Sequence, residues 1–174
     1  MTRIAIFASG SGSNAENIYN HFEGNDSVEI ALILANKPEA YVLERAKKLS
    51  IPSFVFSAKD FRESKVVLEK LTSENIDFIV LAGFLLLVPG YLVDAFPNKI
   101  INIHPALLPQ YGGKGMYGDN VHKAVVANNE KKSGITIHYV NECYDEGNII
   151  FQTDVDLLPT DTFDDVASKI HQLE

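Results

Sequence analysis

The chain has 174 residues and a formal net charge of −8. An acidic chain of this kind lacks the basic face that nucleic-acid binding usually requires, so no nucleic-acid role is expected. No apolar run approaches the ~20 residues of a membrane-spanning helix, and Cys143 is the only cysteine, so we expect no membrane role and a cytoplasmic location.

Short apolar runs alternate with longer amphipathic segments in the first part of the chain. This pattern predicts strands at 3–9, 28–36, 53–57 and 76–84, and helices at 15–22, 40–50 and 60–75. The fourth strand is apolar on both faces, which is typical of a parallel strand that helices cover on both sides.

The second part of the chain continues the alternation and then changes it. A helix is expected at 89–96, a strand at 99–106, a helix at 118–130, two strands at 133–140 and 148–158, and a closing helix at 161–174. The last two strands are close in sequence and should be antiparallel neighbours, and Asp161 or Thr162 should cap the closing helix. The predicted fold class is α/β: a Rossmann-like, doubly wound, mostly parallel sheet with an antiparallel edge extension.

We expect residues 1–174 to form a single domain, large enough to bury a core. The closing helix has no stop signal before Glu174. We therefore expect that the natural protein continues beyond this residue.

A Gly/Ser-rich loop, SGSGSN at residues 9–14, follows the first predicted strand and opens a helix. Such a loop points backbone N–H groups at one spot, where the helix dipole also favours an anion. A dinucleotide site would need an acidic residue after the second strand, where this chain has Asn36. A tight strand-to-helix turn is the alternative, and we favour a phosphomonoester site.

Two polar residues, Asn102 and His104, interrupt the apolar strand at 99–106, which stops at Pro105. Residues two apart in a strand project to the same side. Ligands of open α/β sheets bind at the carboxyl ends of strands, so this pair is expected to face the same crevice as the Gly-rich loop. Together an amide and an imidazolium can stabilise an oxyanion. A structural Asn beside a core His is the alternative.

Asp145 lies in a loop between the last two predicted strands, and Gly147 lets this loop turn sharply. A carboxylate beside His104 would orient the imidazole and favour its charged form. The sequence alone does not place Asp145 there, because Glu142 and Glu146 are similar loop carboxylates. The five histidines show no metal-ligand spacing, so no metal site is expected.

Three segments together resemble one family. The loop GSGSN, the segment NIHPALLPQY and the segment GITIHYVNECYDEGNII are similar to the signatures of the phosphoribosylglycinamide formyltransferases. The resemblance runs from Arg3 to Glu174. It implies transfer of a formyl group from 10-formyltetrahydrofolate to the amine of 5-phosphoribosyl-glycinamide, a step of de novo purine biosynthesis.

The resemblance also implies roles for individual residues. The catalytic trio is matched by Asn102, His104 and Asp145. The residues that match substrate binding, through the phosphate or the ribose hydroxyls, are Gly12, Ser13, Asn14 and Glu174. The residues that match folate contacts are Arg62, Leu85, Leu86, Leu87, Val88, Asn102, Asn141, Glu142, Cys143 and Tyr144. The Gly-rich loop at 112–118 is a longer version of the family's loop and is expected to close over the substrate.

The implied mechanism is direct acyl transfer. Protonated His104 and the Asn102 amide meet the tetrahedral oxyanion, while Asp145 keeps His104 oriented and cationic. No cofactor is expected to stay bound, because 10-formyltetrahydrofolate is a cosubstrate. The expected partners are these two small molecules, and the chain is expected to be a monomer or a homodimer.

Three other functions compete with this interpretation. A formyltetrahydrofolate hydrolase shares the signature but carries an additional N-terminal regulatory domain. A methionyl-tRNA formyltransferase carries a C-terminal nucleic-acid domain, and neither extra domain is expected here. A non-catalytic sugar-phosphate-binding module is the alternative from a different class.

Overall fold

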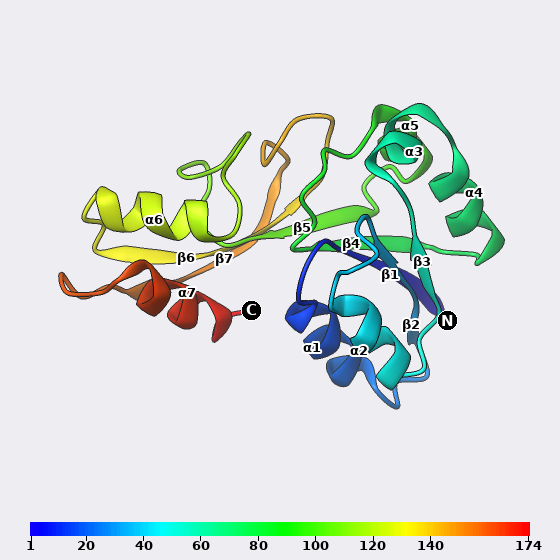
Figure 1. Ribbon diagram of the computed structural model, residues 1–174, viewed down its shortest axis with the longest axis horizontal. Coiled ribbons are helices and arrows are strands. Elements are labelled where there is room, and N and C mark those ends of the chain that lie inside the picture. Colours follow the sequence, from blue (N-terminus) through cyan, green and yellow to red (C-terminus); the bar gives the residue numbers. More distant parts are fainter. The chain divides into compact units, whose positions relative to one another are not determined.

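The computed structural model describes residues 1–174, which divide into two compact units, residues 1–100 and 101–174. Helices and strands alternate along the ribbon (Figure 1). None of the helices has the length and apolar character that crossing a bilayer requires. The expectation that the whole chain forms a single domain stays a prediction.

The first unit is built on parallel strands. They run in the order β3-β2-β1-β4, with all three neighbouring pairs parallel. The strands are β1 (Thr2–Ala8), β2 (Val28–Ala35), β3 (Ser53–Val55) and β4 (Phe78–Ala82). The helices are α1 (Ser13–Phe22), α2 (Val42–Lys48), α3 (Ala58–Glu63), α4 (Val66–Ser73) and α5 (Gly90–Ala95). Helices α1 and α2 lie on one side of these strands, and α3, α4 and α5 on the other (Figure 1).

One predicted helix is wrong, because residues 60–75 do not form a continuous helix. The backbone at Ser64 is extended, with φ −129° and ψ 171°, and this separates α3 from α4. The Ser64 hydroxyl donates to the Asp60 carbonyl at 2.8 Å and lies 3.4 Å from the Val66 N–H. A serine side chain thus replaces the helical hydrogen bonds at this point, which apolar periodicity does not reveal.

Aromatic side chains fill the space beside the carboxyl ends of the first unit's strands. Phe7 and Phe61 are fully buried, and the ring centroids of Phe56 and Phe61 lie 5.1 Å apart. The centroids of Phe7 and Phe84 lie 5.3 Å apart. The Tyr91 hydroxyl donates to the Phe61 carbonyl at 2.9 Å, so α5 and α3 are held together around this cluster.

The second unit is built on antiparallel strands. Its strands β5 (Ile100–His104), β6 (Lys132–Tyr139) and β7 (Ile149–Asp156) run in the order β5-β6-β7. Both neighbouring pairs are antiparallel, as predicted for the last two strands. The parallel strands of the first unit and the antiparallel ones of the second confirm the predicted fold class.

Two helices complete the second unit, α6 (Asp119–Ala127) and α7 (Phe163–His171). Their buried faces share a small core with β6, which consists of Val125, Ile135, Val166 and Ile170. Thr162 caps α7 and forms a capping box with Asp165, which decides between the two predicted caps.

Phe61 tests how much the aromatic cluster contributes to stability. Phe61→Ala is expected to lower the free energy of unfolding by about 3–5 kcal/mol, because it leaves a cavity among packed rings. Val55, which is 42% exposed, provides the control: Val55→Ala should change the free energy by about 0.5 kcal/mol or less. Urea unfolding followed by circular dichroism measures both, and equal effects would contradict this account.

Candidate active site

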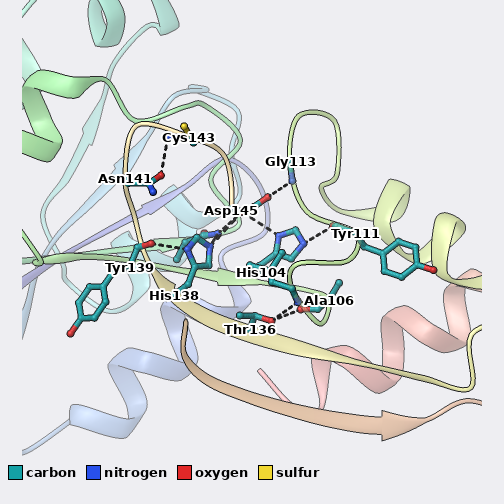
Figure 2. A network of polar contacts seen from close by, with 12 residues as sticks. His104, Ala106, Tyr111, Gly113, Thr136, His138, Tyr139, Asn141, Cys143 and Asp145 are labelled. Carbon is teal, nitrogen blue, oxygen red and sulfur yellow. Dashed lines mark hydrogen bonds and ion pairs between the residues drawn. The ribbon is translucent and has the colours of Figure 1, made fainter. Parts of the chain in front are cut away.

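The second unit brings together the three polar side chains that the sequence indicated. Asn102 and His104 lie two residues apart at the end of β5, and Asp145 lies in the loop between β6 and β7. The Oδ1 atom of Asp145 lies 3.5 Å from His104 Nδ1 and 3.3 Å from Asn102 Nδ2. Figure 2 shows Asp145 reaching toward His104 and toward a second imidazole, that of His138. All three groups are within direct interaction distance.

The loop that carries Asp145 turns back tightly against β6. The backbone of Asp145 has φ 57°, a left-handed conformation that aspartate tolerates better than most residues. Gly147 lies so close to β6 that a Cβ atom there would be 1.6 Å from the Tyr139 carbonyl oxygen. Only glycine therefore fits at this position, because any side chain would collide with the backbone of β6.

A backbone carbonyl fixes the tautomer of His104. Its Nε2 atom lies 2.8 Å from the carbonyl oxygen of Tyr111, and a carbonyl only accepts, so Nε2 carries a proton. The other nitrogen, Nδ1, faces Asp145. The ring is 3% exposed, so these two groups dominate its electrostatic environment.

Burial decides the charge of His104 in the free protein. Burial lowers the pKa of His104 below its ordinary value of 6.5, and it outweighs the Asp145 carboxylate and the Tyr111 carbonyl, which raise it. The ring is therefore mainly neutral near pH 7. This differs from the sequence expectation of a ring that Asp145 keeps cationic, because the cost of desolvating the charge is the larger effect.

The carboxylate of Asp145 is held by several donors. Burial raises the pKa of Asp145, but His138, His104 and the Gly113 N–H together outweigh burial and hold that pKa below 3.8. The Gly113 N–H donates to Oδ2 at 3.0 Å. This bond ties the Gly-rich loop at 112–118 to the cluster. Asp145 is therefore ionised at neutral pH.

A second imidazole, His138, completes the cluster, and the sequence reasoning did not include it. Its Nδ1 lies 2.8 Å from the Tyr139 carbonyl and therefore carries a proton, while its Nε2 lies 3.1 Å from Asn102 Nδ2. His138 is opposite Asn102 in the antiparallel register of β5 and β6. A buried His in the apolar alternation of ITIHYV is the signal that could have indicated it.

The contacts of His138 also restrain Asn102. The Nδ2 group of Asn102 lies within hydrogen-bond distance of both His138 Nε2 and Asp145 Oδ1. Both of its hydrogens are thus engaged within the cluster. Donation to an oxyanion, as expected from the sequence, requires Asn102 to exchange one of these bonds.

The Gly-rich loop of the first unit forms the N-terminus of α1. Gly12 has φ 73°, and a Cβ atom there would lie 2.3 Å from the Val42 side chain, so α2 packs directly on the loop. Helix α1 begins at Ser13, and its first N–H groups lack helical acceptors. Arg45 donates to the Ser11 carbonyl at 2.8 Å and also pairs with Glu16. This ion pair offsets a negative charge next to the free N–H groups.

Two side chains of this loop are buried. Asn14 is 9% exposed, and its Oδ1 atom has no hydrogen-bond partner in the protein. The Ser9 hydroxyl donates to Asn36 Oδ1 at 2.6 Å and accepts from the Leu85 N–H at 3.0 Å. Asn36, at the position where a dinucleotide site needs an acid, therefore supports the loop itself.

The remaining predicted contacts lie in several segments. The stretch at 85–88 follows β4, with Val88 buried and Leu87 39% exposed. Residues 141–144 are exposed at the start of the loop that carries Asp145, and Arg62 is exposed on α3. The Glu174 carboxylate lies 2.8 Å from His171 Nδ1. The roles predicted for these residues in binding folate or ribose stay predictions. The structure contains no group of three or more His, Cys, Asp or Glu arranged to hold a metal ion.

The family model described as formyl transferase matches residues 2–174. The chain belongs to the formyl transferase family. It is 38% identical to the phosphoribosylglycinamide formyltransferase of Bacillus subtilis over 179 residues, covering 100% of this chain and 89% of that protein. The crystal structure of the phosphoribosylglycinamide formyltransferase from Bacillus halodurans is similar with a TM-score of 0.87 and 38% identity, covering 99% of this chain and 91% of that one.

A plant member of the family is also similar. The chain is 40% identical to the chloroplastic phosphoribosylglycinamide formyltransferase of Arabidopsis thaliana, covering 97% of this chain. It spans 60% of the length of this plant relative.

The pKa of His104 predicts how stability depends on pH. Because the folded protein lowers this pKa below 6.5, the unfolded chain binds more protons than the folded one just below pH 6.5. Stability that is fully present above pH 6.5 should therefore fall as the pH drops through the folded pKa. His104→Gln should reduce this acid sensitivity, as measured by urea unfolding between about pH 7 and 5.

His122 provides the matched comparison for that experiment. Burial also lowers the pKa of His122, on helix α6. Some of the loss of stability at low pH should therefore remain in His104→Gln, and it should be smaller still in the double variant with His122→Gln. Histidine NMR titration of the folded protein should place both pKa values below 6.5. A His104 that titrates above this value would contradict the account.

Proposed function

We propose that this chain transfers the formyl group of 10-formyltetrahydrofolate to the amine of 5-phosphoribosyl-glycinamide in de novo purine biosynthesis. The observation that carries the proposal is the cluster in which Asn102 and Asp145 meet around the buried ring of His104, in a member of the formyl transferase family. The Bacillus subtilis relative bears the name of this activity and is covered over 89% of its length. We propose a cytoplasmic location, as a monomer or a homodimer.

The proposed reaction begins with attack of the substrate amine on the formyl carbon. Negative charge then develops on the formyl oxygen, and this charge adds to that of Asp145 in favouring a protonated His104. The imidazolium stabilises the oxyanion through its charge, since both of its nitrogens have partners in Tyr111 and Asp145, and the Asn102 amide donates to it; loss of one such group commonly costs ~10²–10³ in rate. The C–N bond to the folate then breaks. The proton that leaves the attacking amine passes to His104 through a water that Asp145 positions, and the imidazolium formed in this way gives a proton to the leaving nitrogen.

Asp145 and the neutral His104 have different roles in this scheme. A ring with a lowered pKa gains a proton where the new charge appears, so its positive charge is present when the oxyanion forms. Asp145 is ionised and lies 3.5 Å from Nδ1. It therefore holds the ring in one orientation and compensates the positive charge when it forms.

The N-terminus of α1 is the proposed phosphate site, formed by Gly12, Ser13 and Asn14. Free N–H groups and the positive end of a helix of 10 residues favour a dianionic phosphate. The buried carboxamide of Asn14 adds a side-chain donor, Nδ2, beside them. We propose Glu174 for the ribose hydroxyls, since its carboxylate accepts hydrogen bonds.

We propose that the folate contacts come from two loops and one arginine. The first loop is the stretch after β4 with Leu85, Leu86, Leu87 and Val88, whose apolar side chains suit a flat pterin ring. The second loop contributes Asn141, Glu142, Cys143 and Tyr144, and Arg62 provides a cation for the glutamate tail. No resident cofactor takes part, because the folate arrives and leaves as a cosubstrate.

Substitution of the cluster tests the proposed chemistry. His104→Ala and Asp145→Asn should each lower kcat by about 10²–10³, since each removes charge stabilisation from the transition state. The assay follows deformylated folate by absorbance, with and without the ribonucleotide substrate. His21→Ala, at an exposed histidine of α1, is the control and should retain full turnover.

The same assay separates the other functions. Deformylation that does not need the ribonucleotide would indicate a hydrolase, and no deformylation at all would indicate a sugar-phosphate-binding module. Near-normal turnover of folded His104→Ala or Asp145→Asn would contradict the catalytic role proposed for the cluster.

Substitution of Asn14 tests the phosphate site separately. Asn14→Leu removes a donor, and Asn14→Asp places a negative charge beside the bound phosphate. Both should raise the KM for the ribonucleotide by about tenfold or more while leaving the KM for the folate nearly unchanged. The Asp variant should show the larger effect. Equal increases in the two KM values would contradict the phosphate role.

A further inference from the structure

A buried hydroxyl on β6 lies at the centre of a second set of hydrogen bonds, next to the catalytic cluster. Thr136 is fully buried. Its Oγ1 atom donates to the Ala106 carbonyl at 2.7 Å and accepts from the Leu108 N–H at 3.0 Å. Figure 2 shows this side chain directly below His104, with its bond to Ala106. One hydroxyl therefore holds both ends of a three-residue backbone segment.

A neighbouring side chain on β7 reinforces this contact. The Nε2 group of Gln152 donates to Thr136 Oγ1 and to the Leu108 carbonyl, both at 2.9 Å. In the strand register, Thr136 is paired with His104 on one side and with Gln152 on the other. His104, Thr136 and Gln152 thus form a polar row across β5, β6 and β7.

The segment held by Thr136 leads directly to the group that fixes His104. Residues 106–108 lie between His104 and Tyr111, whose carbonyl accepts the Nε2 proton of the ring at 2.8 Å. The far end of this stretch is anchored too, since the Tyr111 hydroxyl donates to Glu130 Oε1 at 2.6 Å and accepts from Asn128 Nδ2 at 2.8 Å. The position of the Tyr111 carbonyl therefore depends on anchors at both ends.

We propose that Thr136 is a positioning residue for His104. Its hydroxyl holds residues 106–108 so that the Tyr111 carbonyl keeps the Nε2 proton and turns Nδ1 toward Asp145. Thr136 does not touch the reacting atoms. Its effect on turnover rests on the proposed formyl transfer, whereas its effect on the ring of His104 does not.

The decisive variant is Thr136→Val, which keeps the shape of the side chain and removes only the hydroxyl. The Ala106 carbonyl and the Leu108 N–H then lose a buried partner, and the segment shifts. We expect kcat to fall by about 10- to 100-fold, because small displacements of a catalytic group are costly. The Tyr111 carbonyl raises the pKa of His104, so weakening that bond should lower the pKa seen by histidine NMR.

Two further variants on the strands sharpen the test. Thr136→Ser keeps the hydroxyl and should restore kcat to within about threefold of the wild type and restore the His104 titration. Ser133→Ala is the matched control: Ser133 is a buried β6 residue whose hydroxyl has no hydrogen-bond partner. It should leave kcat and the His104 pKa unchanged, whatever it does to stability.

The outcomes separate positioning from a purely structural role. If folded Thr136→Val loses stability but keeps the wild-type kcat and the wild-type titration of His104, the proposal is overturned. If Thr136→Val does not fold, Gln152→Met at an exposed position on β7 should lower kcat and the His104 pKa in the same direction, and no change in either overturns the proposal. If the wild type lacks turnover, formyl transfer fails, and the NMR titration alone still decides the role of Thr136.

Discussion

The contacts of one partly buried carboxylate, that of Asp145, hold the candidate site together. Asp145 accepts from the Gly113 N–H at 3.0 Å and the Asn102 amide at 3.3 Å, and each of two imidazoles lies 3.5 Å away. A buried charge without such partners would cost several kcal/mol, on the order of the stability of a whole domain. The ends of β5 and β6 and the Gly-rich loop at 112–118 are therefore positioned so that their polar groups contact this carboxylate.

Burial and charge act in opposite directions on His104, and this opposition suits the proposed chemistry. Burial favours the neutral ring, while Asp145 favours the cation. Because the two effects partly cancel, one further negative charge nearby is enough to favour protonation. An oxyanion that forms only in the transition state supplies that charge at the right moment. A solvated histidine would respond less, since water screens the new charge.

The sequence predicted the polar side chains of the site better than it predicted the neighbouring groups that hold them in place. Asn102 and His104 were found because a strand places residues two apart on one face, and Thr162 was found because helix caps have a local signature. The break at Ser64 was missed, because a local hydrogen bond there overrides apolar periodicity. His138 was missed because its place opposite Asn102 appears only with the antiparallel register. The Tyr111 carbonyl has no sequence signal, since every residue carries one.

The two imidazoles carry their protons on opposite nitrogens, and backbone carbonyls decide this. Tyr111 fixes the proton of His104 on Nε2, whereas Tyr139 fixes that of His138 on Nδ1. The other nitrogen of each ring, Nδ1 of His104 and Nε2 of His138, lies 3.5 Å from the Asp145 carboxylate. A proton on either nitrogen is attracted by the carboxylate, so the charges of the three groups are coupled. A proton that enters the cluster is therefore shared among the three groups, and the proposed formyl transfer requires the movement of one such proton.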